Sequence, residues 1–340
     1  MQNRIPQHSS AQLTRRNMLR LTCVAVPAAA ALAVPNFVGV AAAADYVKPD
    51  WSNTGIPVGT DLTVYYGDIV ITSPGTVIDS LDVYGYIKVR AADVTIRRSR
   101  IRGTGAASGN IGLIDCNHAA ARNVLIEDNL LVPDSPSVWV DGVIGKEYTA
   151  RRNNVYNTVD GFGVYNAQDW TGACNVTIES NFIHDLAFFS MDPNHSNGTH
   201  NDGIQVQGGS NVNILGNNIL MFYSQKHGTL DYSSRSGGNG ILIGANLSPI
   251  TDSRMTGNWL NGGIDGMYIL RGHSSEMRFG TVSDNRFGHD QFGFSGGTST
   301  YQIRVQDSGV IFDNSLTENY WQHTGSALAV GKTGGIRYDS

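Results

Sequence analysis

The sequence predicts a right-handed parallel β-helix, an all-β solenoid with capped ends and two long loop insertions. One pattern, apolar-x-apolar-x-x-Asn-x-apolar, recurs along the chain, clearest at Val124–Leu131, Val176–Ile183 and Val212–Ile219. A second kind of strand, introduced by Asp-Gly or Asn-Gly, precedes each copy. Two strand types that alternate without helices between them exclude Rossmann and TIM arrangements. Similar segments that return at a long period stack as coils.

The repeated asparagine sets the length of one coil. It stands at positions 129, 153, 181, 217, 258, 285 and 314, so the intervals are 24, 28, 36, 41, 27 and 29 residues. A coil of 24 to 30 residues with two long excursions gives this series. Asparagine tolerates the left-handed conformation at a sharp turn and can hydrogen-bond to its copy in the next coil. We therefore assign these residues to an internal structural ladder.

The Asp-Gly markers predict a second row. They introduce five strands, at Asp141, Asp160, Asp202, Asn239 and Asp265. Stacked strands lie about 4.8 Å apart, so equivalent residues of successive coils form a line. A line of carboxylates is costly unless the side chains cap turns, bind a cation or perform acid–base chemistry. We interpret Asp141 and Asp265 as turn residues and leave both interpretations open for Asp160 and Asp202.

The mature chain is expected to be one domain, residues 45–340. Gly67–Ile71 and Val77–Ile78 are the expected first coils. An unpaired solenoid end needs a cover, and residues 45–66 and 320–340 are the candidate caps.

Residues 1–44 resemble a twin-arginine export signal. Thr14–Leu19 holds the arginine pair, an apolar run follows over Leu21–Val40, and Ala41–Ala44 precedes the expected mature start at Asp45. A membrane anchor is the alternative, which the prolines in the run and the cleavage-type sequence disfavour. We expect a secreted protein that folds before export and keeps no stable membrane anchor.

The net charge of the mature chain limits the kinds of partner that we expect. Removal of residues 1–44 leaves 20 basic and 29 acidic side chains, a net charge of −9. Nucleic-acid binding needs a basic face, so we expect no nucleic-acid partner, and we expect a monomer.

Cys116 and Cys174 remain as an even pair about two coils apart, and the sequence leaves open whether they are bridged.

The two long loop insertions contain most of the candidate catalytic and binding residues. They run over residues 188–202 and 223–235 and leave consecutive coils, so they should stand side by side and form the wall of a groove. His200, Asp202, Lys226 and His227 lie on or beside them. Further candidates are Arg271 and Tyr268 in the next coil, and Tyr223 and Trp170 as sugar-stacking rings.

The Asn-Val-x-Ile-x-x-Asn strands resemble the pectate lyase-like right-handed β-helix superfamily over the whole mature chain. The element His-Asn-Asp-Gly-Ile-Gln at His200–Gln205 is similar to that of bacterial secreted right-handed β-helix repeat proteins. The superfamily includes polysaccharide lyases, polygalacturonase-type hydrolases, epimerases and phage tailspikes. Asn201-Asp202-Gly203 matches one polygalacturonase motif. The family's Asp-Asp pair is absent, and Gly238-Asn239-Gly240 stands where Gly-His-Gly would fall.

The leading hypothesis is a polysaccharide lyase acting by β-elimination on a uronate-containing glycan. A base (Lys226, His200 or Arg271) would remove the proton next to the uronate carboxyl, while Asp160 and Asp202 bind Ca²⁺ or orient the base. The expected substrate contacts are Asn201, Gln205, His227, Tyr268, Tyr223 and Trp170. A polygalacturonase-like glycoside hydrolase with Asp202 as general acid is one alternative. A non-catalytic glycan-binding or adhesion solenoid is the other. No cofactor besides Ca²⁺ is indicated.

Overall fold

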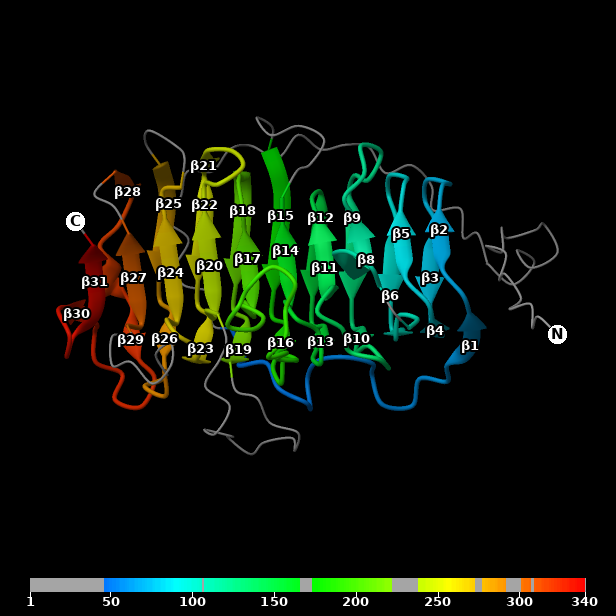
Figure 1. Ribbon diagram of the computed structural model, residues 1–340, viewed down its shortest axis with the longest axis horizontal. Coiled ribbons are helices and arrows are strands. Elements are labelled where there is room, and N and C mark those ends of the chain that lie inside the picture. Colours follow the sequence, from blue (N-terminus) through cyan, green and yellow to red (C-terminus); the bar gives the residue numbers. More distant parts are fainter. Residues whose placement is uncertain are drawn as a thin grey trace.

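The computed structural model describes residues 46–105, 107–165, 173–221, 238–272, 277–291, 301–306 and 309–339. The expected export signal lies outside these ranges. The chain winds as a right-handed parallel β-helix with three faces, and each coil contributes a strand to each of three parallel sheets (Figure 1). None of the described residues forms a helix long and apolar enough to cross a membrane.

Within the described residues, the first sheet, sheet A, has ten strands: β1 (Thr63–Tyr66), β4 (Leu81–Tyr84), β7 (Arg100–Ile101), β10 (Leu130–Leu131), β13 (Asn154–Val155), β16 (Phe182–Ile183), β19 (Asn218–Met221), β23 (Trp259–Gly262), β26 (Arg286–Phe287) and β29 (Tyr320–Trp321).

Sheet B follows in each coil and contains β2 (Ile69–Ile71), β5 (Ile87–Val89), β8 (Ile111–Cys116), β11 (Val140–Gly145), β14 (Phe162–Val164), β17 (Ile204–Val206), β20 (Ile241–Gly244), β24 (Met267–Leu270), β27 (Ile303–Gln306), β31 (Gly335–Asp339) and β30 (Ala329–Val330).

Sheet C completes each coil with β3 (Val77–Asp79), β6 (Thr95–Arg97), β9 (Val124–Glu127), β12 (Tyr148–Arg151), β15 (Ala173–Glu179), β18 (Gly209–Leu215), β22 (Ser253–Thr256), β25 (Met277–Ser283) and β28 (Val310–Phe312), while β21 (Ile250–Thr251) pairs with β18.

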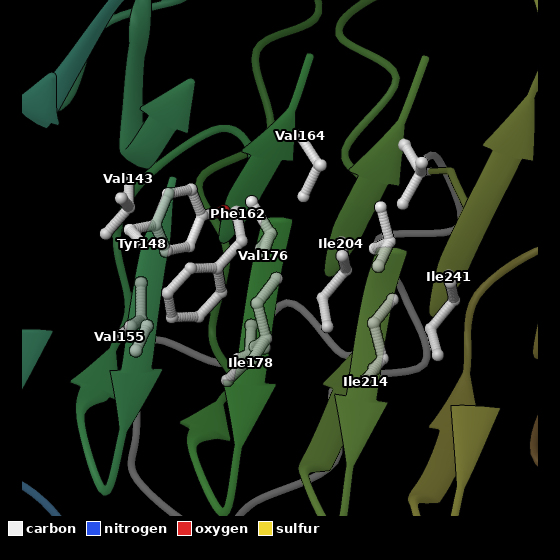
Figure 2. Packing of buried hydrophobic residues seen from close by; sticks show 14 of the residues in the cluster. Val143, Tyr148, Val155, Phe162, Val164, Val176, Ile178, Ile204, Ile214 and Ile241 are labelled. Carbon is white, nitrogen blue, oxygen red and sulfur yellow. The ribbon is translucent and has the colours of Figure 1, made fainter. Parts of the chain in front are cut away.

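The core is a stack of inward-facing apolar side chains. Alternate residues of each strand point inward, and Val176 and Ile178 of β15 are completely buried. They pair in register with Val212 and Ile214 of the next coil, and Figure 2 shows such residues stacked along the axis. Because every coil buries the same positions against its neighbours, the apolar repeat of the sequence becomes one continuous core.

The asparagine ladder is confirmed, with one correction. The main-chain N–H and Nδ2 of Asn129 both donate to Oδ1 of Asn153, at 3.0 Å each. The same pair of hydrogen bonds repeats through Asn181, Asn217, Asn258 and Asn285. The last member is Asn319, not Asn314, because the 3₁₀ turn Leu316–Glu318 lengthens this coil before the ladder position is reached.

The left-handed residue of this turn is not the ladder asparagine. It is the residue immediately before it, for example Asp128 (φ 57°), Ser180 (φ 54°) and Asp284 (φ 57°). The asparagine itself turns its side chain inward, where the amide replaces the main-chain partners that the bend removes. The expectation that the ladder asparagine itself takes the left-handed conformation was therefore wrong for these positions.

The Asp-Gly row is also confirmed, and the structure explains its glycines. A Cβ atom at Gly142 would lie 2.3 Å from the carbonyl oxygen of Gly161 in the next coil, and one at Gly161 would lie 2.4 Å from that of Gly203. Gly203 and Gly240 repeat the contact at 2.5 Å. These main-chain oxygens cannot move aside, so only glycine, which has no Cβ atom, fits at these positions.

The two expected caps take other roles. Residues 46–62 do not close the end of the solenoid but run along sheet A as an extended segment (Figure 1). At the other end, β29 and β31 pair with β26 and β27 and so add a last coil. Gly67–Ile71 and Val77–Ile78 contribute β2 and β3, as predicted for the first coils. Cys116 and Cys174 are both buried free thiols.

Candidate functional site

The candidate site lies where the chain passes from sheet A to sheet B, at the aspartate row. The N–H of Asp202 donates to Oδ1 of Asp160 at 2.8 Å, and the N–H of Asp160 donates to Oδ1 of Asp141 at 3.3 Å. Oδ1 of Asp202 in turn accepts from the N–H and Nδ2 of Asn239, at 2.7 and 3.1 Å. Each carboxyl thus caps the strand of the following coil, which gives the row a structural role whatever else it does.

The row carries acids that titrate near neutrality. Burial raises the pKa of Asp202 to about 7, although its hydrogen bonds from Asn239 and Gln205 oppose the shift. Burial also raises the pKa of Asp141 to about 7. The pKa of Asp160 is raised well above its ordinary range by burial and then by the negative charges of Asp141 and Asp202. Acids whose pKa values are raised in this way can donate protons or hydrogen bonds.

Two glutamines extend the row across the outer face of sheet B. Gln205 faces outward from β17 between the buried Ile204 and Val206, and its Nε2 lies 3.5 Å from Oδ2 of Asp202. Nε2 of Gln207 donates to Oε1 of Gln205 at 2.6 Å. A line of polar groups therefore crosses the strand from the carboxyl row.

The first long loop folds back on itself beside the row. Oγ1 of Thr199 accepts from the N–H of Phe189 at 3.0 Å and donates to Oδ1 of Asn201 at 2.9 Å. Nδ2 of Asn201 donates to the carbonyls of Val159 and Ala187. Asn201 is completely buried, so it fastens the loop to the solenoid and does not occupy the substrate-contacting position predicted for it.

His200 lies on the same loop in a small polar cluster. Its ring stacks on His195 with centroids 4.1 Å apart, and Nδ1 of His195 lies 2.6 Å from Oδ2 of Asp192. Burial lowers the pKa of His200, and the neighbouring His195 lowers it further, while Asp192 opposes both. His200 is therefore neutral at physiological pH, which is the form a general base needs.

The structure separates other predicted residues from the row. Tyr268 faces outward from β24, where Arg304 covers its ring at 4.8 Å and Gln306 accepts from its hydroxyl. Tyr268 is in register with Leu242, which pairs with Gln205, so it lies two coils from Gln205 on the same face. Arg271 follows the other end of β24. It stands six positions after the row residue Asp265, about 20 Å along an extended chain, so the structure does not bring Arg271 to the aspartates. Lys226, His227, Tyr223 and Trp170 lie outside the described residues.

The row does not provide the Ca²⁺ site that was considered. Oδ1 of both Asp160 and Asp202 already accepts main-chain N–H groups. Among the described residues no three acidic, histidine or cysteine side chains gather closely enough to hold a metal ion. Calcium requires six to eight oxygen ligands, so the donors present here do not fit it.

Sequence reasoning missed two members of this surface. Asp141 was interpreted as a turn residue, yet its pKa shift matches that of Asp202. Gln207 was not considered, although it stands two residues after Gln205 and so faces the same side of the strand. That spacing was visible in the sequence. The pKa shift was not, because it depends on burial in the folded chain.

Comparisons with known proteins give distant structural likenesses. No family model and no curated protein matches the sequence. The A-module of a mannuronan C-5 epimerase from Azotobacter vinelandii aligns over 70% of this chain and 59% of its own length, with 13% identity and a TM-score of 0.42. The enzymatically active domain of tailspike protein 2 from bacteriophage CBA120 aligns over 83% and 42%, with 11% identity and a TM-score of 0.34.

A third likeness is to the catalytic unit of a GH87 α-1,3-glucanase from Streptomyces thermodiastaticus, over 85% of this chain and 69% of that one. Its identity is 15% and its TM-score is 0.33. This chain thus spans less than two thirds of the epimerase module and of the tailspike domain. The assignment of the fold rests on the sheet topology of the chain itself.

Proposed function

We propose that this protein is a carbohydrate-active enzyme that binds a polysaccharide across the outer face of sheet B and cleaves it at the aspartate row. The observation that carries the proposal is the line of Asp141, Asp160 and Asp202, whose carboxyl groups all have raised pKa values, about 7 for Asp141 and Asp202, beside the outward-facing Gln205 of β17. Acids with raised pKa values beside convergent polar groups are typical of active sites.

The reaction proposed first is β-elimination on a uronate-containing glycan. The protonated carboxyl of Asp202 and the amide of Gln205 would donate hydrogen bonds to the uronate carboxylate and so stabilise the charge that develops when the neighbouring proton leaves. His200, neutral at physiological pH, is the described side chain that would accept that proton. A C=C bond would then form as the C–O bond to the neighbouring sugar breaks, and the leaving oxygen would take a proton from water.

Hydrolysis is the second candidate, and the spacing of the row favours it. Asp160 and Asp202 occupy successive coils, about 4.8 Å apart by strand spacing, close to the roughly 5–5.5 Å between the carboxyl groups of retaining glycosidases. In this reaction one carboxyl group would protonate the leaving oxygen and the other would act as nucleophile.

One experiment separates these reactions. The mature protein is incubated with uronate-containing and neutral polysaccharides, and both ultraviolet absorbance and reducing ends are followed. Elimination gives an absorbing unsaturated product together with new ends, whereas hydrolysis gives new ends alone. Asp202→Asn should abolish either activity. Asp265→Asn is the matched control, because Asp265 caps the N–H of Tyr301 from the same row but lies two coils away.

Export belongs to the proposal as well. A double change of Arg15 and Arg16 to lysine should keep the precursor inside the cell, whereas the unaltered chain should appear outside without residues 1–44. Equal secretion of both chains would refute the twin-arginine assignment.

A further inference from the structure

Residues 46–62, which we call the strap, contact coils that are far apart in the sequence. The carbonyl of Pro49 accepts from Nδ2 of Asn218 at 2.7 Å, across 169 residues. The N–H of Gly55 donates to the carbonyl of Arg152 at 2.8 Å. The strap then enters β1 at Thr63, in the first coil. Figure 1 shows it as the blue segment that runs beside β19, β16, β13 and β10.

Tyr46, at the start of the strap, sits in a seat made by two glycines. A Cβ atom at Gly216 would lie 2.4 Å from the Tyr46 ring, and one at Gly257 would lie 2.6 Å from it. Both are the left-handed residue before a ladder asparagine. Other coils place larger residues at this position, namely Arg98, Asp128, Arg152, Ser180 and Asp284. Glycine thus occurs at the two coils where the ring of Tyr46 would otherwise be displaced.

Trp51, in the middle of the strap, rests on an aromatic platform from sheet A. Its ring centroid lies 4.3 Å from that of His184 and 5.7 Å from those of Phe182 and Tyr156. His184 is 2% exposed, and its ring stacks on Phe182 at 4.2 Å. Oδ2 of Asp185 and Oδ1 of Asn154 lie 2.6 and 2.9 Å from its two ring nitrogens. The platform is therefore held rigidly in place by the coil beneath the strap and by the preceding one.

These contacts differ in kind from those within a solenoid. Coils of a repeat protein contact only their neighbours, so stability is nearly a sum of local terms and segments can unfold separately. The strap contacts the coils that contain Asn153, Asn181, Asn217 and Asn258. It must therefore detach before any one of these coils can open.

We propose that the strap is a clamp that makes the coils from Asn153 to Asn258 unfold as one cooperative unit. The contacts of Tyr46, Pro49, Trp51 and Gly55 are the coupling. Removal of the Trp51 contact should uncouple these coils, so that they open locally while the remaining coils stay folded.

The test is hydrogen exchange of the full mature chain, measured by peptide-resolved mass spectrometry for Trp51→Ala. Peptides of β13, β16 and β19 should exchange at least about tenfold faster than in the unaltered protein, while those of β2, β5 and β27 keep their rates. Urea unfolding should broaden or split, with a lower m-value. Trp321→Ala is the control, because this tryptophan also lies in sheet A but beyond the seats of the described strap.

Uniform acceleration across all coils, with one transition and an unchanged m-value, would show that the strap adds stability without coupling and would overturn the proposal. Should Trp51→Ala fail to fold, Tyr46→Ala removes only the ring above Gly216 and Gly257 and is read in the same way. Faster exchange in β13, β16 and β19 together is then the expected result, and faster exchange confined to β19 and β23, the coils that touch Tyr46, contradicts the clamp.

Discussion

Replacement of Asn181 by alanine removes one step of the internal ladder and should destabilise the whole fold. The side chain is completely buried. Its Oδ1 accepts from the N–H and Nδ2 of Asn153, both at 2.9 Å. Its Nδ2 donates to the carbonyl of Ala150 at 2.9 Å and to Oδ1 of Asn217 at 3.0 Å. Four hydrogen bonds are lost, and the buried N–H of Asn153 loses its partner.

The magnitude follows from those losses. An orphaned buried donor costs about 1–3 kcal/mol, and each further hydrogen bond contributes roughly 1 kcal/mol. We therefore expect Asn181→Ala to lower the free energy of unfolding by about 4–6 kcal/mol, a value that only a few kinds of substitution reach.

The assay is urea unfolding followed by far-ultraviolet circular dichroism, with Asn213→Ala as the control. Asn213 faces outward from β18 and makes one long side-chain hydrogen bond, at 3.3 Å to Asn211, so its removal should cost less than about 1 kcal/mol. Equal losses for the two variants would refute the idea that the ladder replaces the main-chain partners lost at the bend.

Three further predictions concern the row and the thiols. Because burial raises the pKa of Asp202 to about 7, its contribution to stability is complete below the ordinary pKa near 4 and is lost as the pH rises through 7. Melting temperatures should fall between about pH 4 and 7, and Asp202→Asn should flatten that slope; an unchanged slope would contradict the shift. Gly203→Ala should prevent folding or sharply lower the melting temperature, since its Cβ would meet the carbonyl of Gly240; a variant as stable as the parent would count against this packing. Cys116 and Cys174 should react with a thiol reagent only after unfolding, and reaction of the native protein would contradict their burial.

The repeat made the fold predictable because a solenoid uses one local rule in every coil. The alternation of apolar residues predicted which side chains face inward. The Asn and Asp-Gly markers predicted two rows and which residues align from coil to coil. The rule failed at Asn314, where a short 3₁₀ turn moved the ladder position to Asn319. A single departure from the period cannot be read from spacing alone when a nearby asparagine also satisfies the pattern.

The site was less predictable, because it depends on three-dimensional placement. The sequence located the row and Gln205. It could not show that Asn201 points inward to hold the loop, or that Arg271 follows the end of β24 that lies away from the aspartate row. Both depend on which way a loop residue turns at a strand end. The strap was mistaken for a cap because its partners lie far from it in the sequence.

The measurement that tests the central claim most directly is the release of products from polysaccharides by the mature protein, with Asp202→Asn and Asp265→Asn assayed in parallel. The account predicts new chain ends from at least one glycan, their loss in Asp202→Asn and their persistence in Asp265→Asn. Ultraviolet absorbance in the same samples would assign β-elimination. Full activity in folded Asp202→Asn, or no cleavage of any glycan by the parent protein, would contradict catalysis at the aspartate row.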